Sequence, residues 1–416
     1  MNTVQAIAAG IHSLPSTGTA FAATQAAWRF FHNPRITLPD LAAPLQQAGR
    51  DLAAASSSPF ALVVHDWSKL DYDGHRSKRD LCQLSQPRDI GYELTTALLV
   101  DAAAGHPLAP MDVAVRAADG VHTTTDTAVQ PPQPHLDQVL PAMQVAAGWG
   151  VCKRLVHVID REGDSVQHLR AWADAGHLFV ARGDDRIVTH DGRKRKLSAI
   201  AADLAGALDA ATPRAIEVRG QQAWQHVAEA AVVLSEPGWE RLADGKKQRV
   251  RGTALPLRLI VTQVRDARGA VLAEWWLLTN VSEVAAEVIA QWYYWRWRIE
   301  SFHKLLKSAG LEVEEWQQET AGAITRRLLV GCMACVTVWR LGAAEGPAAR
   351  ACRRFLMRLS GRQLKRGVEA TAPGLLAGLH LLLAMLDVLE QYRLEELYEF
   401  ARIALPHPRP PNGSDV

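Results

Sequence analysis

The chain reads FALVVHD from Phe60 to Asp66, a short apolar run that ends in a carboxylate. A second run, LVHVID from Leu155 to Asp160, has the same form. Continuous apolar runs of this length are typical of strands buried in a sheet. Ligands and catalytic groups gather at the carboxyl ends of such strands in open α/β sheets. Asp66 and Asp160 are therefore candidate site residues.

Each of these carboxylates is a weak signal by itself. An Asp that follows a buried strand more often forms a turn or caps a helix than binds a ligand. Asp71 and Asp73 compete with the first carboxylate, and Glu162 and Asp164 compete with the second.

The segments around these two runs alternate between strand and helix patterns, which predicts a mixed α/β architecture. Further strands are expected at 95–101, 111–116 and 177–182, and helices at 135–147 and 163–175. Short strand signals follow at 214–219, 227–234, 257–264 and 273–279, so that 183–283 reads as a mostly β insertion. Helical patterns return at Glu283 and continue to the end.

Four units are expected along the chain. They are a helical N-terminal domain at 1–57, an α/β domain at 58–325, a helical C-terminal domain at 326–405 and a disordered Pro-rich tail at 406–416. The first unit contains an aromatic helix that ends at a proline, within 24–34. Arg29, His32 and Arg35 are its candidates for contacting DNA.

A charged stripe is expected on a helix between Tyr293 and Lys307. At about 100° per residue, Arg296, Glu300 and Lys307 fall at about 300°, 340° and 320° from Tyr293, and Lys304 at about 20°. One carboxylate flanked by a phenol, a guanidinium and an ammonium suits a metal ion and a phosphate together. By spacing alone, a solvated face with weak ion pairs is the commoner outcome.

The net charge of the 416-residue chain is only +2, so a nucleic-acid binder of this kind must concentrate its charge locally. Three clusters do so, although charge runs are usually solvated faces. They are 193–196; Lys246, Lys247, Arg249 and Arg251; and Arg350, Arg353, Arg354, Arg358, Arg362, Lys365 and Arg366.

The 5 Cys and the absence of a signal peptide favour a cytoplasmic protein. Cys332 and Cys335 lie in an apolar helical stretch, which favours buried thiols over zinc ligands. The apolar run from Gly374 to Leu386 is short and contains a histidine, so we expect a core or partner helix and no membrane span.

Asp66, Asp160 and Glu300 together would suit two divalent ions about 4 Å apart. One ion would activate a water or a 3′-hydroxyl, and the other would stabilise the leaving oxygen. Mg²⁺ is the expected metal, with Mn²⁺ as a substitute, because carboxylates and waters supply its oxygen shell.

The order of these carboxylates and the Tyr293-Arg296-Glu300-Lys307 spacing resemble the DDE transposases of bacterial insertion sequences. The nearest branch is the insertion-sequence-four family, with its Tyr-x2-Arg-x3-Glu-x6-Lys signature. The stretch from Asp160 to Asp164 looks like the family's second-Asp motif, and 24–34 is similar to its DNA-end-binding domain. The resemblance covers nearly the whole chain.

The resemblance implies an RNase H-like catalytic core, a mixed sheet flanked by helices and interrupted by the β insertion. It also implies cut-and-paste transposition through nicking, hairpin formation, hairpin opening and strand transfer into target DNA. The partners would be the double-stranded terminal inverted repeats, the target DNA and a second copy in a two-fold synaptic dimer. The helices at about 375–403 are candidates for that interface, although burial in the monomer is an equal expectation.

The resemblance also implies roles for the companion residues. Tyr293, Arg296, Lys307 and Lys304 would hold DNA phosphates through charge-assisted hydrogen bonds. Trp275 looks like the family's base-stacking residue and Trp276 is the alternative; because they alternate on a strand, one should face the site.

One departure concerns the first Asp, where the family usually has Asp-Thr-Thr and this chain has Asp66-Trp67-Ser68. Leu70 and Tyr72 keep the expected spacing. Two other activities compatible with these motifs are a catalytically inactive, DNA-binding relative and an RNase H-like nuclease without strand transfer.

Overall fold

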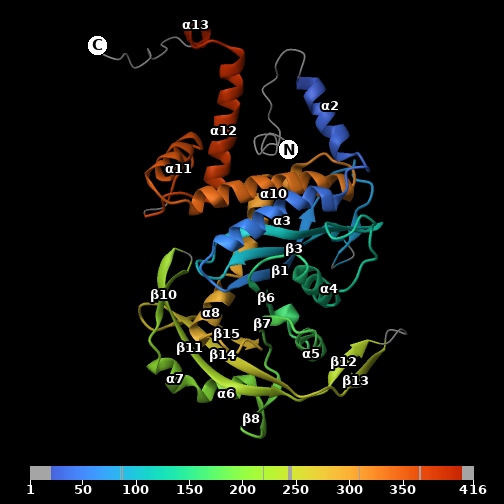
Figure 1. Cartoon of the computed structure of the whole chain (residues 1–416), viewed down its shortest axis with the longest axis vertical. Coiled ribbons are helices and arrows are strands. Elements are labelled where there is room, and N and C mark those ends of the chain that lie inside the picture. The colour runs from blue at the N-terminus through green and yellow to red at the C-terminus, as the bar shows by residue number, and fades with distance from the viewer. Residues whose placement is uncertain are drawn as a thin grey trace.

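The computed structural model describes residues 20–84, 86, 88–218, 220–241, 246–308, 310–364 and 367–404 (Figure 1). The expected tail at 406–416 lies outside the described residues, as do Lys365 and Arg366 of the third basic cluster.

A single 13-stranded mixed sheet runs through the molecule, in the order β5-β4-β3-β1-β6-β7-β15-β14-β11-β8-β9, with β2 on β3 and β10 on β11. Its first half consists of β1 (Phe60–Asp71), β2 (Cys82–Gln83), β3 (Ile90–Asp101), β4 (Pro107–Ala117), β5 (Gly120–Thr123), β6 (Arg154–Ile159) and β7 (Leu178–Arg182). Strands β1, β3 and β4 pair antiparallel, whereas β1, β6 and β7 pair parallel.

The central strands form where the apolar runs predicted them, because they are buried on both faces. Residues 60–65 of β1 and 156–159 of β6 are buried throughout. One expectation was wrong, since β1 does not end at Asp66 but continues to Asp71. The extension pairs with β3, where Lys69 lies opposite Glu93 and Leu70 opposite Tyr92, so neighbouring backbone groups keep the strand extended.

The region expected as an insertion extends the same sheet, because β15 pairs antiparallel with β7. Its strands are β8 (Ile187–His190), β9 (Arg193–Lys196), β10 (Arg214–Val218), β11 (Gln221–Leu234), β12 (Gly238–Arg241), β13 (Lys247–Val250), β14 (Leu255–Arg265) and β15 (Val271–Thr279). The β12–β13 pair forms a separate two-stranded ribbon. Two short helices, α6 (Leu197–Asp203) and α7 (Ala205–Ala210), interrupt the strands.

Helices cover both faces of the sheet (Figure 1). They are α2 (Ala20–Phe31), α3 (Leu38–Ala55), α4 (His135–Ala147), α5 (Val166–Asp174), α8 (Ala286–Tyr294), α9 (Trp297–Lys307), α10 (Ala321–Ala343), α11 (Pro347–Leu359), α12 (Ala372–Gln391) and α13 (Leu394–Ala404), with short 3₁₀ turns at Arg161–Gly163 and Val313–Glu315. Apolar residues of α3, α8, α9 and α10 share one core with β1, β3 and β4. Those of α5, α6 and α7 form a second core with β7, β11 and β14. The expected boundary at 325/326 falls inside α10, and the four-unit division stays a prediction.

Two of the described helices are long and apolar enough to cross a membrane by length and composition. In α10 the apolar window is 78% buried, and Cys332 and Cys335 are fully buried in the core as expected. In α12 the corresponding window is only 22% buried, and the helix projects from the body in Figure 1.

Buried histidines predict a pH dependence of stability. Burial lowers the pKa of His65 and of His303 to about 4, from the ordinary value of 6.5, and Lys307 adds to the effect at His303. Between these values the unfolded chain binds more protons than the folded chain, so stability falls as the pH falls. Each histidine should contribute about 1.4 kcal/mol per pH unit in this window.

Urea denaturation from neutral pH down to about pH 4 measures this slope. The substitution His303→Gln should reduce the slope of stability against pH by about 1.4 kcal/mol per pH unit, the contribution of one proton. An unchanged slope in this variant would contradict a neutral, buried His303.

Candidate active site

The parallel pairing of β1 with β6 places Asp66 beside Asp160. Val64 lies opposite Val158, and each Asp follows two residues later along its own chain. Because side chains alternate along a strand, each Asp keeps the side of the sheet on which Val64 and Val158 lie. Asp160 follows the last residue of β6 as expected, and its Oδ1 accepts a hydrogen bond of 2.8 Å from the Glu162 backbone.

Three of the four competing acidic residues have other partners, and the fourth, Asp73, is exposed. Asp71 is exposed and pairs with Lys69. Glu162 is bound to His135. The Asp164 carboxylate lies 2.6 Å from Arg186 and also accepts a hydrogen bond from the Asp184 backbone, so it fixes the following loop.

Glu300 lies on α9 close enough for its charge to act on Asp66, but not on the continuous helix expected for 293–307. The helix ends at Tyr294 and a new helix begins at Trp297. Between them the Arg296 N–H donates to Tyr293 O at 3.0 Å, an i to i+3 bond that tightens the turn. Tyr293 therefore lies on α8, whereas Glu300 and Lys307 lie on α9.

Arg296 links two of the three carboxylates. Its Nη2 lies 2.7 Å from Glu300 Oε1, and its Nη1 lies 3.7 Å from Asp66 Oδ2. The residue is only 9% exposed, so its charge acts in a poorly hydrated site. Its Nε is also buried and has no hydrogen-bond partner within the described part of the chain.

The pKa of Asp66 depends on its burial and on the charges of Arg296, Asp160 and Glu300. Burial raises the pKa of Asp66 to about 6, Arg296 opposes the shift, and the charges of Asp160 and Glu300 add to it. Three carboxylates near one another repel, so the site favours a cation between them.

The residues present suit a divalent metal by their chemistry, because carboxylate oxygens are the ligands that Mg²⁺ prefers. Their ligand atoms do not all lie within 4.8 Å of one another, and Arg296 pairs with both Asp66 and Glu300. The one described set with ligand atoms mutually within 4.8 Å is Asp80, Asp119 and His122. Both oxygens of Asp80 already accept hydrogen bonds, from Tyr92 and from the Ala321 backbone.

Tyr293 and Trp275 lie together at one side of Arg296. Their ring centroids are 5.8 Å apart, and the guanidinium carbon lies 5.9 Å from the Tyr293 ring. Burial raises the pKa of Tyr293, while Arg296 and Arg182 lower it. Trp276 instead packs against the second core and donates to Glu274 at 2.9 Å. Trp275 is thus the tryptophan that contacts a residue of the stripe.

A cavity of about 610 Å³ borders this group. Its walls include Trp275, Tyr294 and the exposed Trp297, whose ring lies 5.6 Å from the Arg296 guanidinium. The walls are mostly apolar and aromatic, which suits a flat, stacking ligand.

The two lysines of α9 differ in their surroundings. Lys307 lies 3.3 Å from Glu314, whose Oε1 also accepts a hydrogen bond from the Asp71 backbone. This contact ties the end of α9 to the end of β1. Lys304 is exposed on the same helix.

The expected DNA-end residues lie apart from the carboxylates, on and after α2. Arg29 and Arg35 are exposed, and the His32 ring stacks on Trp28 with centroids 4.1 Å apart. Phe31 of the same helix is buried against Val330 of α10. The segment therefore packs on the body while its basic residues face outward.

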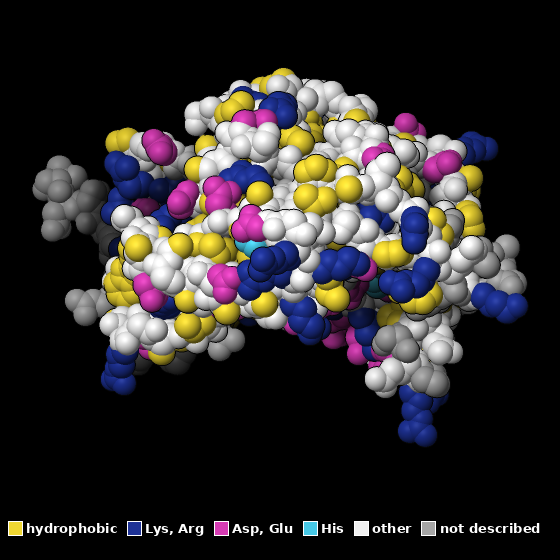
Figure 2. Space-filling model, turned by 90° about the horizontal axis from the view of Figure 1, so that it is seen from below, with side chains coloured by type: hydrophobic (Ala, Val, Ile, Leu, Met, Phe, Trp, Pro, Cys, Tyr) yellow, Lys and Arg dark blue, Asp and Glu magenta, His cyan; other side chains and the backbone are white. Residues whose placement is uncertain are grey.

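The basic clusters at 193–196 and on the β12–β13 ribbon differ in their partners. Lys194, Arg195 and Lys196 all pair with acidic residues. On the β12–β13 ribbon, Arg249 lies over the exposed Trp239 ring, 5.7 Å from its centroid. Figure 2 shows the face seen from below, where a row of Lys and Arg side chains crosses the middle with Asp and Glu beside it.

A network around Trp67 was not foreseen from the sequence. The Trp67 ring stacks on His135 with centroids 4.6 Å apart and an interplanar angle of 8°. His135 binds Glu93 at 2.9 Å and Glu162 at 3.1 Å, and the bond to Glu93 raises its pKa. Trp67, which stands where the family usually has Thr, is thus linked through His135 to Glu162 in the loop that follows Asp160. The departure from the family's Thr was the only sign of this contact in the sequence.

No family model matches the sequence, and no curated protein matches it. Among solved structures, the chain is similar to the piggyBac transposase in a cryo-EM structure of its synaptic complex with hairpin DNA, with a TM-score of 0.33 and 8% identity. The match covers 85% of this chain and 59% of that one, so the chain spans less than two thirds of that neighbour. This structural likeness is weak.

The position of Arg296 predicts competition between its guanidinium and a metal ion. Arg296→Gln should destabilise the metal-free protein by on the order of 3 kcal/mol, because two partly buried carboxylates lose their cation. It should also enlarge the rise in melting temperature that Mg²⁺ or Mn²⁺ causes, because the ion restores the lost charge.

Thermal melts with and without the metal measure both effects. Arg268→Gln, a substitution of an exposed arginine, is the matched control. A smaller metal-dependent rise in Arg296→Gln than in the unaltered protein would rule out this competition.

Proposed function

We propose that the protein is a metal-dependent DNA transposase of the DDE type, related to the insertion-sequence-four family. The observation that carries this proposal is the pairing of Arg296 with Asp66 and Glu300, with the charge of Asp160 acting on both Asp66 and Arg296. Carboxylates from three distant parts of the chain thus lie near one guanidinium, a group that binds phosphate. This combination suits phosphoryl transfer on a nucleic acid.

The proposed catalytic core is RNase H-like. The strand order β4-β3-β1-β6-β7, with β1, β3 and β4 antiparallel and β6 and β7 parallel to β1, supports it. The strands after β7 would form the β insertion, which returns to the core through β15.

Asp66, Asp160 and Glu300 would hold two Mg²⁺ ions, for which Mn²⁺ would substitute. The ions would supply Lewis acidity and a low-pKa nucleophile for in-line displacement at a DNA phosphate. Deprotonated Asp66 is needed for binding them, which its pKa of about 6 permits at neutral pH. Release of the Arg296 guanidinium from Asp66 and Glu300 would accompany binding.

Arg296 and Tyr293 would then bind a phosphate of the DNA. The buried, unpartnered Nε of Arg296 offers a donor to a phosphate oxygen. Lys307 would exchange Glu314 for a phosphate, and Lys304 would add a second ammonium from the exposed side. Trp275, at the wall of the 610 Å³ cavity, would stack with an unpaired base, as a sharply bent hairpin end requires.

The proposed partners are duplex terminal repeats, target DNA and a second copy of the chain. Arg29, His32 and Arg35 would contact the element's ends from the N-terminal helix. We propose a cytoplasmic location with the protein on the nucleoid when DNA is bound.

The test is a cleavage assay with purified protein, Mg²⁺ and a DNA duplex that carries the element's terminal repeat. A transposase should give nicks, then hairpins, then joined products. Binding without cleavage would identify an inactive DNA-binding relative, and cleavage without hairpins would identify a nuclease.

Glu300→Gln should abolish cleavage, by at least about a hundredfold, and should spare DNA binding, because an amide replaces a metal-ligating carboxylate. Gel shift in Ca²⁺ measures binding and the nicking assay measures cleavage. Glu287→Gln, an exposed residue of α8, is the matched control. Retained cleavage in Glu300→Gln would exclude it as a metal ligand.

Lys307→Ala should weaken hairpin or end-complex formation more than the first nick, since a bent end crowds phosphates that need a cation. Single-turnover kinetics separate the two steps, with Arg154→Ala, which removes an exposed ion pair with Glu283, as the control. An equal loss of both steps would contradict the phosphate role.

A further inference from the structure

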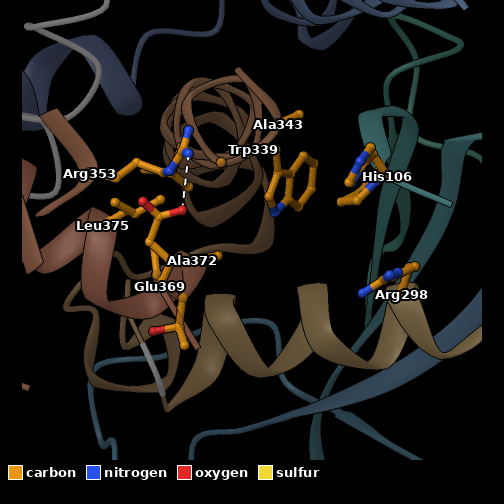
Figure 3. A pocket seen from close by; sticks show the side chains of 13 residues that line it. His106, Arg298, Trp339, Ala343, Arg353, Glu369, Ala372 and Leu375 are labelled. Atoms are coloured by element: carbon orange, nitrogen blue, oxygen red, sulfur yellow. Dashed lines mark hydrogen bonds and ion pairs between the residues drawn. The ribbon is translucent and has the colours of Figure 1, made fainter. Parts of the chain in front are cut away.

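A cavity of about 340 Å³ lies where α9 and the β3–β4 turn meet the C-terminal end of α10 and the start of α12 (Figure 3). Arg298, which lines it, is two residues from Glu300 on α9, so their side chains point about 200° apart around the helix. The cavity therefore lies on the other side of α9 from the candidate active site. Its volume is at the lower end of the range of about 300–1,000 Å³ that is usual for small-molecule sites.

One end of this cavity presents hydrogen-bond donors without partners. Arg298 donates from its Nε to Gly105 O at 2.8 Å, and its two Nη groups bind no other residue that the structure describes. The exposed His106 ring and the Trp339 Nε1 also have no hydrogen bond to the described part of the chain. A guanidinium with free donors favours an anion at this end.

The charges at the opposite end of the cavity are already paired, as Figure 3 shows. Arg353 donates to the backbone oxygens of Leu341 and Ala344. It also pairs with Glu369 at 3.3 Å. The Glu369 carboxylate would repel a second negative charge here. The cavity therefore suits a ligand with a single anionic end, placed at Arg298.

The wall between the two ends is apolar and aromatic. Val338, Ala343 and Leu375 line it together with the Trp339 ring. Phe302 of α9 holds this ring edge to face, with centroids 5.5 Å apart and an interplanar angle of 66°. An aromatic ring fixed in an apolar wall favours a flat, uncharged ring beside it.

The anionic end is held in place by the packing of the β3–β4 turn. Gly105 has a φ of +70°, and a Cβ there would meet the Trp295 ring at 2.3 Å. The turn therefore rests directly on Trp295, at the break between α8 and α9, and its carbonyl fixes the Arg298 Nε. Because the guanidinium is already oriented, binding a ligand requires little further ordering, which lowers its entropic cost.

We propose that this cavity binds a nucleoside monophosphate. Its phosphate lies on Arg298 and His106, and its base lies against Trp339. The planar guanidinium offers two donors that match two phosphate oxygens. A backbone phosphate of duplex DNA fits less well, because the cavity is walled by several elements and its middle is apolar.

This site uses none of the proposed catalytic residues, and its test needs neither DNA nor metal. A failure to bind the nucleotide would therefore leave the proposed transposase function untouched, and a failure of the cleavage assays would leave this site untouched.

Isothermal titration calorimetry on the full chain tests the site, with adenosine monophosphate, adenosine and inorganic phosphate as the probes. The monophosphate should bind saturably. Adenosine and inorganic phosphate should each bind at least about tenfold more weakly, because each makes only part of the contacts. No saturable binding of the monophosphate, or equal binding of adenosine, would overturn the proposal.

Variants then place the ligand in the cavity. Arg298→Gln should raise the dissociation constant of the monophosphate at least about tenfold, and Arg298→Lys should raise it less, because lysine keeps the charge without the paired donors. Trp339→Leu should weaken binding of the monophosphate and leave binding of inorganic phosphate unchanged. Arg340→Gln, which removes an exposed charge beside Trp339 but outside the cavity, is the matched control and should bind like the unaltered protein.

Circular dichroism checks that every variant is folded. If Arg298→Gln does not fold, His106→Gln at an exposed position tests the same end and should raise the dissociation constant about threefold. Equal losses in Arg298→Gln and Arg340→Gln would overturn the proposal, because they would show a general effect of charge. Displacement of the monophosphate by a short DNA duplex would also overturn it, because the donors would then belong to a DNA contact.

Discussion

The ion pairs of Arg296 are the interactions on which the candidate site depends. Burial raises the pKa of Asp66, and the charges of Asp160 and Glu300 add to the rise, so a nearby cation stabilises the ionised carboxylate. Arg296 supplies the cation from the turn that separates α8 from α9. Its bonds therefore hold α9 against β1, and its charge opposes the rise in the pKa of Asp66.

The turn between α8 and α9 puts Tyr293 and Glu300 on two different helices. A continuous helix would place Tyr293, Arg296 and Glu300 on one rigid face, whereas the turn lets Tyr293 pack against Trp275 while Glu300 faces Asp66. The same turn lies beside the aromatic cavity. A shift of the Arg296 side chain would therefore act on both the carboxylates and the stacking surface.

Much of the fold could be predicted from local patterns, because buried strands and amphipathic helices have short sequence signatures. Helix α4 was predicted at its observed bounds, and β6 within one residue. The end of β1 could not be predicted, because its last five residues are held by pairing with β3. The helix break at Trp295 was also missed, since nothing in a run without Gly or Pro marks it. Trp67 and His135 are 68 positions apart, so their stacking depends on tertiary structure.

Cleavage by Fe²⁺ with ascorbate tests most directly whether these carboxylates bind a metal, because a bound iron cuts the polypeptide backbone beside its ligands. We expect fragments that end near Asp66, Asp160 and Glu300, and these fragments should disappear when Mg²⁺ is in excess. Cleavage only near Asp80, Asp119 and His122, the other set of metal-ligating groups, would contradict this expectation.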